Sequence, residues 1–338
     1  MSDFSKRPKV GFVMSGEQFR ADRLVDYGAA AEKAGFDIAW ASDHFQPWQD
    51  NEGHSSFAWA TLAAVTQRTE RMILGTGVTC PTYRYHPSVV AEAFATLALL
   101  APGRVFLGVG TGEALNEQAA GADWGAYPER AERMAEALQI ISKLWSGDWI
   151  SHRGKHWQIE RARLYDVPKT PVPIWVAANG PKSARLAGLY GDGWITTPAA
   201  LKDKETRMAF EQGARAVGKD TSKMEIIMES FAVVGNEDEA REGAKKWRFL
   251  SKAWEPGYLT NPDPRSIQQK AEAEIPLEEV YKDWPVSLNP EVHIHSLREM
   301  VEMGATTVFV HSPQANQLGF IDWYGKYVLP RMSLAGRR

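Results

Sequence analysis

The stretch PSVVAEAFATLALLAPGRVFLGVG, residues 87–110, contains the alternation that decides the fold. Pro87 opens an apolar run that predicts a helix to Leu100, because proline is well tolerated in the first turn of a helix. Ala101-Pro102-Gly103 ends that helix. Val105–Gly110 then predicts a short strand buried on both faces, as strands of parallel sheets are. One helix followed at once by one buried strand indicates an α/β fold.

The same alternation extends over the whole chain. Helices are predicted at Ala21–Ala34, Tyr127–Trp145 and Pro181–Tyr190 as well. Further short apolar runs predict strands at Lys9–Ser15, Ile38–Asp43, Met72–Thr79, Pro173–Ala178, Gly193–Thr197, Met224–Val233 and Thr306–His311. Eight strands with interleaved helices predict the fold class α/β, a (β/α)8 TIM barrel, and 338 residues suit one such domain over residues 1–338.

Two segments depart from the repeat, and we interpret both as loop insertions in the single domain. Residues 147–171 alternate like a hairpin followed by an irregular arm, and residues 251–290 are rich in proline and asparagine before a short helical piece. Neither segment carries enough apolar residues for a core of its own.

Composition excludes several classes of function. The net charge of −3 gives no electrostatic reason to expect a nucleic acid or a membrane surface as partner. No apolar run approaches the roughly 20 residues that span a bilayer. The start, MSDFSKRPKVGF, has basic residues but no hydrophobic core of a signal peptide, so we expect a cytoplasmic protein. The single cysteine, Cys80, excludes an internal disulfide framework and a CxxC site.

Polar residues gather where the predicted strands end, which is where barrel enzymes place their active sites. The first strand leads to Glu17, and the second runs into SDHFQPW, with Asp43, His44, Gln46 and Trp48. The fourth runs into GVGTGEALNE, with Thr111, Gly112, Glu113, Asn116 and Glu117. The third leads to GTGVTCPTYRYHP and the fifth to AANGP. Their convergence at one end of one barrel predicts an active site there.

Each of these residues also has a purely structural interpretation. A lone histidine at a strand end is more often a hydrogen-bonded structural residue than a base, and Glu113 can simply complement a helix dipole. The glycines of GVGTGEALNE do not match the GxGxxG dinucleotide motif. Asp43, His44 and Glu113 are permissible metal ligands, but no HxH or HExxH spacing is present, so we expect no metal.

Four blocks in order, SDHFQPW, PTYRYHP, GRVFLGVGTGEALNE and AANGP…AGLYGDGW, carry a resemblance to a known family. The chain resembles the F420-dependent glucose-6-phosphate dehydrogenase group of the luciferase-like superfamily. It also resembles the F420-dependent secondary-alcohol dehydrogenases, which share the step at Cys80-Pro81. The similarity runs from about Lys9 to Arg331 and is weakest between Ser251 and Pro290.

The resemblance implies a role for each matching residue. His44 is the general base for the substrate hydroxyl, Trp48 packs beside the reacting carbon, Glu113 lies near the cofactor's pyrimidine edge, and Glu17 lies near the substrate. Gly77-Val78 matches the place of a non-prolyl cis peptide that backs the cofactor ring. The other positions implied to contact the coenzyme F420 are Asp43, Cys80, Thr111, Gly112, Asn116, Ala178, Asn179, Gly180 and Pro181.

The implied activity is hydride transfer from an alcohol to C5 of the deazaflavin, in a homodimer that binds a small-molecule substrate. A histidine suits removal of the hydroxyl proton. The phosphate-gripping cations of the glucose-6-phosphate enzymes are replaced by Ala200, by a gap near Pro256-Gly257, and by Asp283. An aspartate facing a phosphate would repel it, which favours a neutral alcohol, although Lys202, Lys252 or Arg265 could be recruited.

Three alternatives stay open on the sequence. The chain could be a sugar-phosphate dehydrogenase that uses different cations, or an FMN-dependent monooxygenase of the same superfamily. It could also be a deazaflavin-binding protein without turnover, although simple binding would not need the base His44. Trp254 and Tyr258 could line an apolar substrate pocket or merely pack the insertion onto the barrel.

Overall fold

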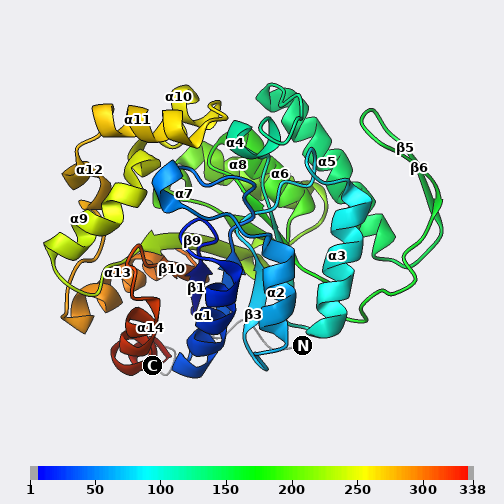
Figure 1. Ribbon diagram of the computed structural model, residues 1–338. Coiled ribbons are helices and arrows are strands. Elements are labelled where there is room, and N and C mark those ends of the chain that lie inside the picture. The colour runs from blue at the N-terminus through cyan, green and yellow to red at the C-terminus, as the bar shows by residue number, and fades with distance from the viewer. Residues whose placement is uncertain (1–6, 334–338) are drawn as a thin grey trace.

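The computed structural model describes residues 7–333, in which a ring of parallel strands is surrounded by helices (Figure 1). The first six residues of the stretch considered for a signal peptide lie outside this range. The barrel closes in the order β1-β10-β9-β8-β7-β4-β3-β2. Its strands are β1 (Lys9–Met14), β2 (Ile38–Ala41), β3 (Ile73–Thr76), β4 (Val105–Val109), β7 (Ile174–Ala177), β8 (Gly193–Ile195), β9 (Glu225–Phe231) and β10 (Thr307–His311). The predicted (β/α)8 barrel is confirmed.

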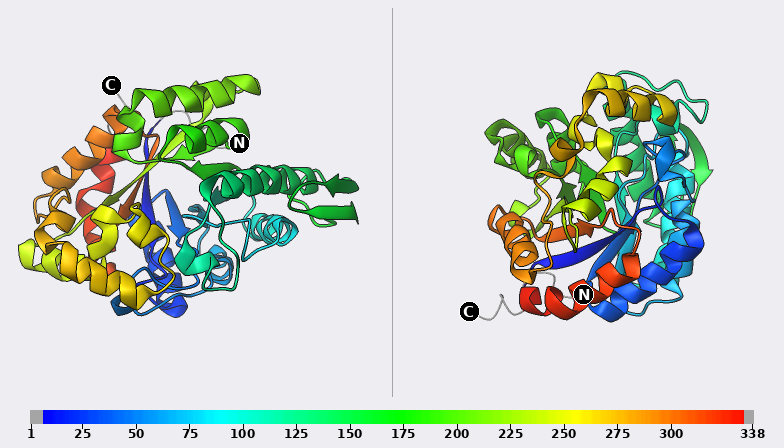
Figure 2. Two further views of the ribbon diagram at one scale, coloured as in Figure 1. Left: turned by 90° about the horizontal axis from the view of Figure 1, so that it is seen from above. Right: turned by 60° about the vertical axis from the view of Figure 1, so that its left-hand side comes forward.

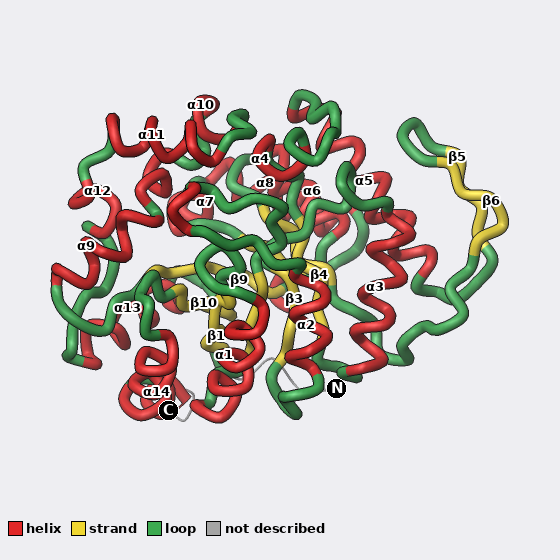
Figure 3. The backbone as a smooth tube through the Cα atoms, viewed as in Figure 1, coloured by secondary structure: helices red, strands yellow, loops and turns green. Residues whose placement is uncertain are grey.

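A helix follows each barrel strand and packs on the outside of the ring (Figure 3). In strand order these helices are α1 (Ala21–Ala34), α2 (Ala58–Thr66), α3 (Pro87–Leu100), α5 (Tyr127–Leu144), α6 (Pro181–Tyr190), α8 (Lys204–Ala216), α13 (Pro290–Glu302) and α14 (Gln317–Tyr327). The local signals explain their bounds. Pro87 stands at the first turn of α3, and α1 ends at Gly35, which adopts the left-handed conformation that favours glycine.

Seven large side chains fill the interior of the barrel: Val13, Ile38, Trp40, Phe106, Trp175, Ile227 and Phe309. Trp40 and Phe309 stack with their ring centroids 3.7 Å apart, and Phe106 stacks on Trp175 at 4.0 Å. Burying each such side chain contributes about 1.5–3 kcal/mol. Because these residues close the middle of the barrel, any interior cavity must lie at one end of it.

The first predicted insertion contains a hairpin, as its alternating pattern indicates. Strands β5 (Ile150–Arg153) and β6 (Gln158–Ala162) pair antiparallel and project from the body of the molecule (Figure 2). His152 contacts Glu136 of α5 at 3.0 Å, and Glu136 also accepts from the backbone N–H groups of His156 and Trp157, which fixes the turn of the hairpin to α5.

The second insertion is more helical than the sequence indicates, and it begins before Ser251. Between β9 and α13 lie α9 (Glu237–Lys246), η3 (Arg248–Lys252), α10 (Pro256–Leu259), α11 (Pro264–Glu274) and α12 (Leu277–Tyr281). Their apolar side chains, Tyr258 and Ile267 among them, form a second hydrophobic cluster together with Trp48 and Leu115 of the barrel loops. The apolar side chains of the insertion therefore pack into a cluster that they share with the barrel.

The remaining elements are short and lie in loops or at the end of the described chain. They are η1 (Asp50–Glu52), α4 (Ala114–Glu117), α7 (Pro198–Lys202), η2 (Thr221–Lys223) and α15 (Leu329–Ser333). Two of them, η1 and α4, follow β2 and β4 and belong to the loops that carry the predicted site residues.

Candidate active site

A cavity of about 350 Å³ opens at the carboxyl ends of the barrel strands. Seven predicted site residues line it: Glu17, His44, Trp48, Gly77, Val78, Glu113 and Asn179. They follow five different strands, β1, β2, β3, β4 and β7, so the fold alone brings them together. The expected convergence at one end of the barrel is present.

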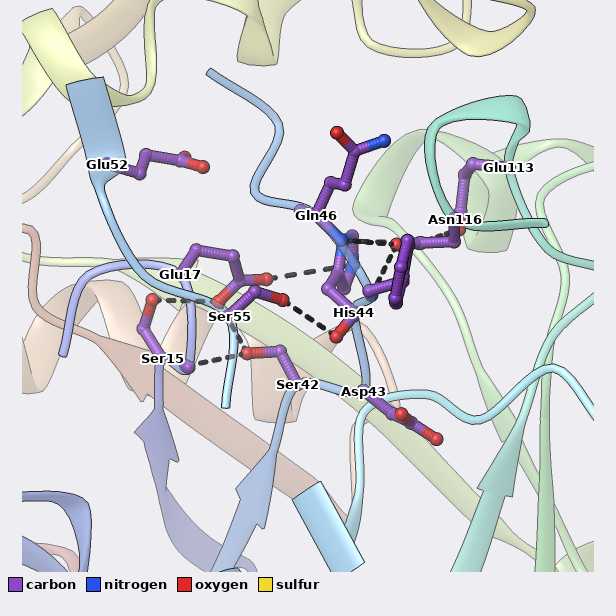
Figure 4. Close-up of polar contacts among 12 residues, drawn as sticks. Ser15, Glu17, Ser42, Asp43, His44, Gln46, Glu52, Ser55, Glu113 and Asn116 are labelled. Carbon is purple, nitrogen blue, oxygen red and sulfur yellow. Dashed lines mark hydrogen bonds and ion pairs between the residues drawn. The ribbon is translucent and has the colours of Figure 1, made fainter. Parts of the chain in front are cut away.

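His44 and Glu17 form the polar centre of the cavity (Figure 4). His44 Nε2 lies 3.6 Å from Glu17 Oε1, which is close for two charges but too long for a hydrogen bond. Both side chains are nearly buried. The other oxygen of Glu17, Oε2, accepts hydrogen bonds from the hydroxyls of Ser15 and Ser42, which hold the carboxylate in place.

The far side of the His44 ring is held by the loop after β4. Its Nδ1 lies 3.3 Å from the carbonyl oxygen of Gln46 and 3.2 Å from the amide nitrogen of Asn116. The Asn116 oxygen accepts from the backbone N–H of Phe45, at 2.8 Å, so the amide nitrogen faces His44. That nitrogen also donates to Glu113, at 3.1 Å. Asn116 therefore lies between the His44 ring and the Glu113 carboxylate and contacts both.

Trp48 is positioned by the second insertion. Its ring stacks on Phe249 at 4.7 Å and lies 5.8 Å from the His44 ring. Next to it, the Gln49 side chain donates to the carbonyl oxygen of Lys245 and accepts from the N–H of Phe249. These contacts fasten the loop that carries His44 to α9 and η3.

Asp43 points away from the Glu17–His44 pair (Figure 4). Its carboxylate accepts from Arg84 at 2.7 Å, from Tyr85 at 2.9 Å and from Thr79 at 2.7 Å. Because its side chain is buried and bonded on both oxygens, Asp43 stabilises the loops after β2 and β3. It does not line the cavity.

The peptide bond between Gly77 and Val78 is cis, as the resemblance predicts. A Cβ on Gly77 would lie 2.4 Å from the Trp40 ring, so only glycine fits at this point. Gly112 has a φ of +78°, and a Cβ there would lie 2.8 Å from the sulfur of Cys80. At Gly77-Val78 the backbone itself thus forms part of the cavity wall.

The other predicted cofactor contacts surround the cavity without lining it. They are Asp43, Cys80, Thr111, Gly112, Asn116, Ala178, Gly180 and Pro181. Thr111 and Gly112 precede Glu113 in the same turn, and Gly180 and Pro181 directly follow Asn179 at the start of α6. Burial raises the pKa of the Cys80 thiol well above its usual range, as does the charge of Glu117 to a lesser degree, so the side chain stays a neutral thiol.

Two further carboxyl groups near the site are affected by burial. Burial, and next the charge of Glu17, raise the pKa of Glu52 well above its usual range. Burial also raises the pKa of Glu117 to about 7, against the opposing effect of a hydrogen bond from the backbone of Arg84.

Several lining residues were not among the predicted site residues. They include Ser42, Glu229, Phe231, Trp247, Phe249 and His311. His311 ends a predicted strand, and the strand-end rule would have found it. Glu229 lies inside a predicted strand, and Trp247 and Phe249 come from the second insertion, where no strand end marks them.

The expected phosphate-site positions lie elsewhere. Asp283 and Gly257 are exposed and outside the cavity lining, and Ala200 is buried in α7. Asp283 follows α12 at the surface, so it neither binds nor repels a phosphate in this cavity. Lys252 pairs with Glu274, and Arg265 pairs with Asp263.

The charged side chains that line the cavity nevertheless favour a neutral alcohol over a phosphorylated substrate. Among the described residues, no lysine or arginine lines it, whereas Glu17, Glu113 and Glu229 do. A phosphate group there would lack the charge-assisted hydrogen bonds that replace its hydration. Trp254 lines the cavity and is exposed, and Tyr258 is fully buried in the second hydrophobic cluster.

Metal binding and membrane insertion are two further features that the described residues can be compared with. In residues 7–333, no group of three or more His, Cys, Asp or Glu side chains is arranged to hold a metal ion. Within the same range, no helix is both long and apolar enough to cross a membrane.

Comparison with known proteins agrees with the resemblance. Residues 8–307 match the family described as luciferase-like monooxygenase. The chain is 50% identical over 323 residues to an F420-dependent hydroxymycolic acid dehydrogenase of Mycobacterium tuberculosis (strain ATCC 25618 / H37Rv), covering 96% of this chain and 88% of that protein. It is 38% identical over 328 residues to an F420-dependent glucose-6-phosphate dehydrogenase of Microbacterium testaceum (strain StLB037), covering 96% and 97%.

A solved structure of an F420-dependent secondary alcohol dehydrogenase, in complex with an F420-acetone adduct, superposes with a TM-score of 0.89. The sequences are 32% identical, and the match covers 95% of this chain and 98% of that one. A long-chain alkane monooxygenase also superposes, with a TM-score of 0.78 at 14% identity over 98% and 92% of the chains, which shows the shared barrel alone.

Proposed function

Since the chain belongs to the luciferase-like monooxygenase family, we propose that it acts within that family as an F420-dependent dehydrogenase that oxidises a CH–OH group of a small molecule. The hydroxymycolic acid, glucose-6-phosphate and secondary-alcohol dehydrogenases similar to this chain are all F420-dependent. The observation that carries the proposal is the position of His44, with Nδ1 anchored at 3.3 Å by Gln46 and Nε2 beside Glu17 in the cavity.

His44 acts as the base in this proposal. With a proton on Nδ1 donated to the Gln46 carbonyl oxygen, and with the Asn116 amide N–H directed to Glu113, the lone pair of Nε2 points at the cavity. Nε2 takes the hydroxyl proton of the substrate as the C–H bond breaks. The imidazolium that results is stabilised by the carboxylate of Glu17, 3.6 Å away. Trp48 packs beside the reacting carbon.

The residues present fit a planar deazaflavin. The cis peptide at Gly77-Val78 lines the cavity, and a Cβ added at Gly180 would meet nothing within 4 Å. We assign the coenzyme to this wall, with Asn179, Glu113 and the surrounding predicted contacts. When bound, F420 supplies the hydride acceptor.

A neutral hydroxyl compound is the substrate class that the cavity supports best. Its lining carries three carboxylates and, within the described part of the chain, no lysine or arginine. The same feature speaks against a sugar phosphate, although relatives with that activity are 38% identical. We also propose a cytoplasmic homodimer, for which the exposed aromatic pair Trp149 and Tyr165 beside the hairpin offers a contact surface. Light scattering of the purified protein tests the oligomeric state.

The proposal is tested by titrating the protein with F420 and with FMN and by following fluorescence. The F420-bound protein is then given secondary alcohols, and the loss of deazaflavin absorbance is recorded. We expect binding of F420 and alcohol-dependent reduction. Tight FMN binding without F420 binding would refute the assignment.

A further inference from the structure

A second Glu–His pair lies in the top layer of the barrel interior. Side chains alternate along a strand, so Glu229 of β9 lies one layer above Ile227, and His311 of β10 lies one layer above Phe309. Ile227 and Phe309 belong to the closed hydrophobic centre. Glu229 and His311 both line the cavity, where a carboxylate is exceptional for a barrel interior filled with apolar side chains.

The hydrogen bonds of His311 are complete. Nδ1 lies 2.7 Å from Glu229 Oε1, and Nε2 lies 3.2 Å from Gln18 Oε1. The Gln18 amide nitrogen donates to the carbonyl oxygen of Pro313, which fixes its oxygen toward the ring. Both ring nitrogens therefore face acceptor oxygens. His311 has no ring nitrogen left for a ligand.

Glu229 keeps free acceptor capacity. Its side chain is 36% exposed, whereas that of His311 is 4% exposed. Oε1 is bonded to His311, and no hydrogen bond from any of residues 7–333 reaches Oε2. The ring of His311 is packed between Phe231, at 4.2 Å, and Trp247, at 4.5 Å, which holds the pair rigid. A pair needed only for packing would not leave a carboxylate oxygen open to the cavity.

The place of Glu229 in the ring determines what can reach it. In the closed order of strands, β9 lies opposite β3, the strand that leads to Gly77-Val78, and β10 is adjacent to β1, the strand that leads to Glu17. If the coenzyme lies against Gly77-Val78, Glu229 faces it across the cavity. A substrate held at His44 fills the space between them.

We propose that Glu229, held by His311, accepts a hydrogen bond from a second hydroxyl group of the substrate. The preferred substrate is then a diol or polyol, with one hydroxyl oxidised at His44 and another recognised at Glu229. A neutral donor fits because Glu229 Oε2 is open to a hydrogen-bond donor, while an anionic group at this position would meet the carboxylate. The oxidation at His44 rests on the proposed function, whereas the hydrogen bond at Glu229 does not depend on it.

The test compares 2-alkanols with the diols made by adding a hydroxyl at the far end, from three to eight carbons. The kcat/KM of F420 reduction is measured for each pair, and the ratio of diol to monoalcohol cancels effects common to both. For the best chain length, we expect a ratio of roughly 10 to 100, the usual worth of a hydrogen bond to a charged group. Glu229→Met, which removes the acceptor, should bring the ratio to about one.

Two controls keep the test decisive. Glu229→Gln retains an acceptor oxygen without charge, so its ratio of diol to monoalcohol should be intermediate. This variant replaces Glu229→Met in the test if that one does not fold. Glu160→Gln on the exposed hairpin should keep the wild-type ratio. Binding of each diol and monoalcohol without coenzyme is followed by tryptophan fluorescence, because Trp48, Trp247 and Trp254 line the cavity.

The outcomes separate this inference from the proposed function. If F420 is not reduced with any alcohol but diols bind more tightly than monoalcohols only when Glu229 is present, the proposed function fails and the inference stands. A ratio near one at every chain length in the wild-type protein, or an unchanged ratio in both Glu229 variants, overturns the inference.

Discussion

Replacing Glu17 by glutamine tests the electrostatic centre of the mechanism. Glutamine has the same shape, and its amide oxygen can still accept from the hydroxyls of Ser15 and Ser42. The variant therefore removes one negative charge 3.6 Å from His44 Nε2 and puts an amide N–H donor in the place of Oε1. Burial raises the pKa of Glu52, which disfavours a second negative charge there.

The magnitude follows from that distance. Two unit charges 3.6 Å apart attract by about 4.6 kcal/mol at an effective dielectric constant of about 20. If roughly half a charge has developed on His44 in the transition state, about 2 kcal/mol is lost, which corresponds to a roughly 30-fold lower rate. Because the charge develops only during the reaction, the loss should appear in kcat as well as in kcat/KM.

The assay is F420 reduction by a secondary alcohol, with F420 affinity and the thermal midpoint measured on the same preparations. We expect an unchanged F420 affinity in Glu17→Gln. The control variant Glu160→Gln, on the exposed hairpin, should have the activity of the wild-type protein. A loss smaller than threefold would show that Glu17 does not stabilise a cationic His44. A loss confined to KM would place Glu17 in substrate binding instead.

Three further predictions follow from the site. His44→Ala should lower turnover roughly 10²–10⁴-fold with F420 affinity unchanged by fluorescence titration; near-normal turnover would make His44 structural. Glu117 has a folded pKa of about 7, above its unfolded value, so its stabilising contribution is present at low pH and is lost as pH rises from about 4.3 through 7. Glu117→Gln should therefore raise the thermal midpoint at pH 8 more than at pH 5, and an equal change at both pH values would contradict this. Glucose 6-phosphate should have a kcat/KM at least about tenfold below that of the best secondary alcohol, because no cation of the described lining meets a phosphate; the reverse order would show that a surface lysine is recruited.

The barrel itself could be predicted because its signals are local. Each strand is a short apolar run, and the helices α1, α3 and α6 begin and end at the residues that their proline and glycine signals indicate. The positions of Glu17, His44 and Glu113 after strand ends predicted that they lie together, because parallel barrel strands all end on the same face. All three line one cavity. Predicted strand ends ran one to three residues too far, since pairing stops where the loops turn into the site.

What the sequence missed depends on contacts between distant segments. Glu229 and His311 are 82 residues apart, and nothing near either residue marks the pair. Asp283 was matched to the phosphate-binding arginine of the resembled group, and it lies at the surface after α12. Phe249, which holds Trp48, comes from the second insertion. These residues were hard to predict because no strand end marks the insertion.

The two histidines of the cavity have different roles because their second nitrogens differ. His311 has both ring nitrogens bonded to side-chain oxygens, at 2.7 and 3.2 Å, so neither nitrogen is available to a substrate. His44 has an acceptor on Nδ1 but only a carboxylate at 3.6 Å beside Nε2, which leaves room for a substrate oxygen. The Glu17–His44 pair can therefore take part in proton transfer with a substrate, whereas both ring nitrogens of the Glu229–His311 pair are already bonded. A substrate with two hydroxyl groups would use both, losing a proton to His44 while donating one hydrogen bond to Glu229.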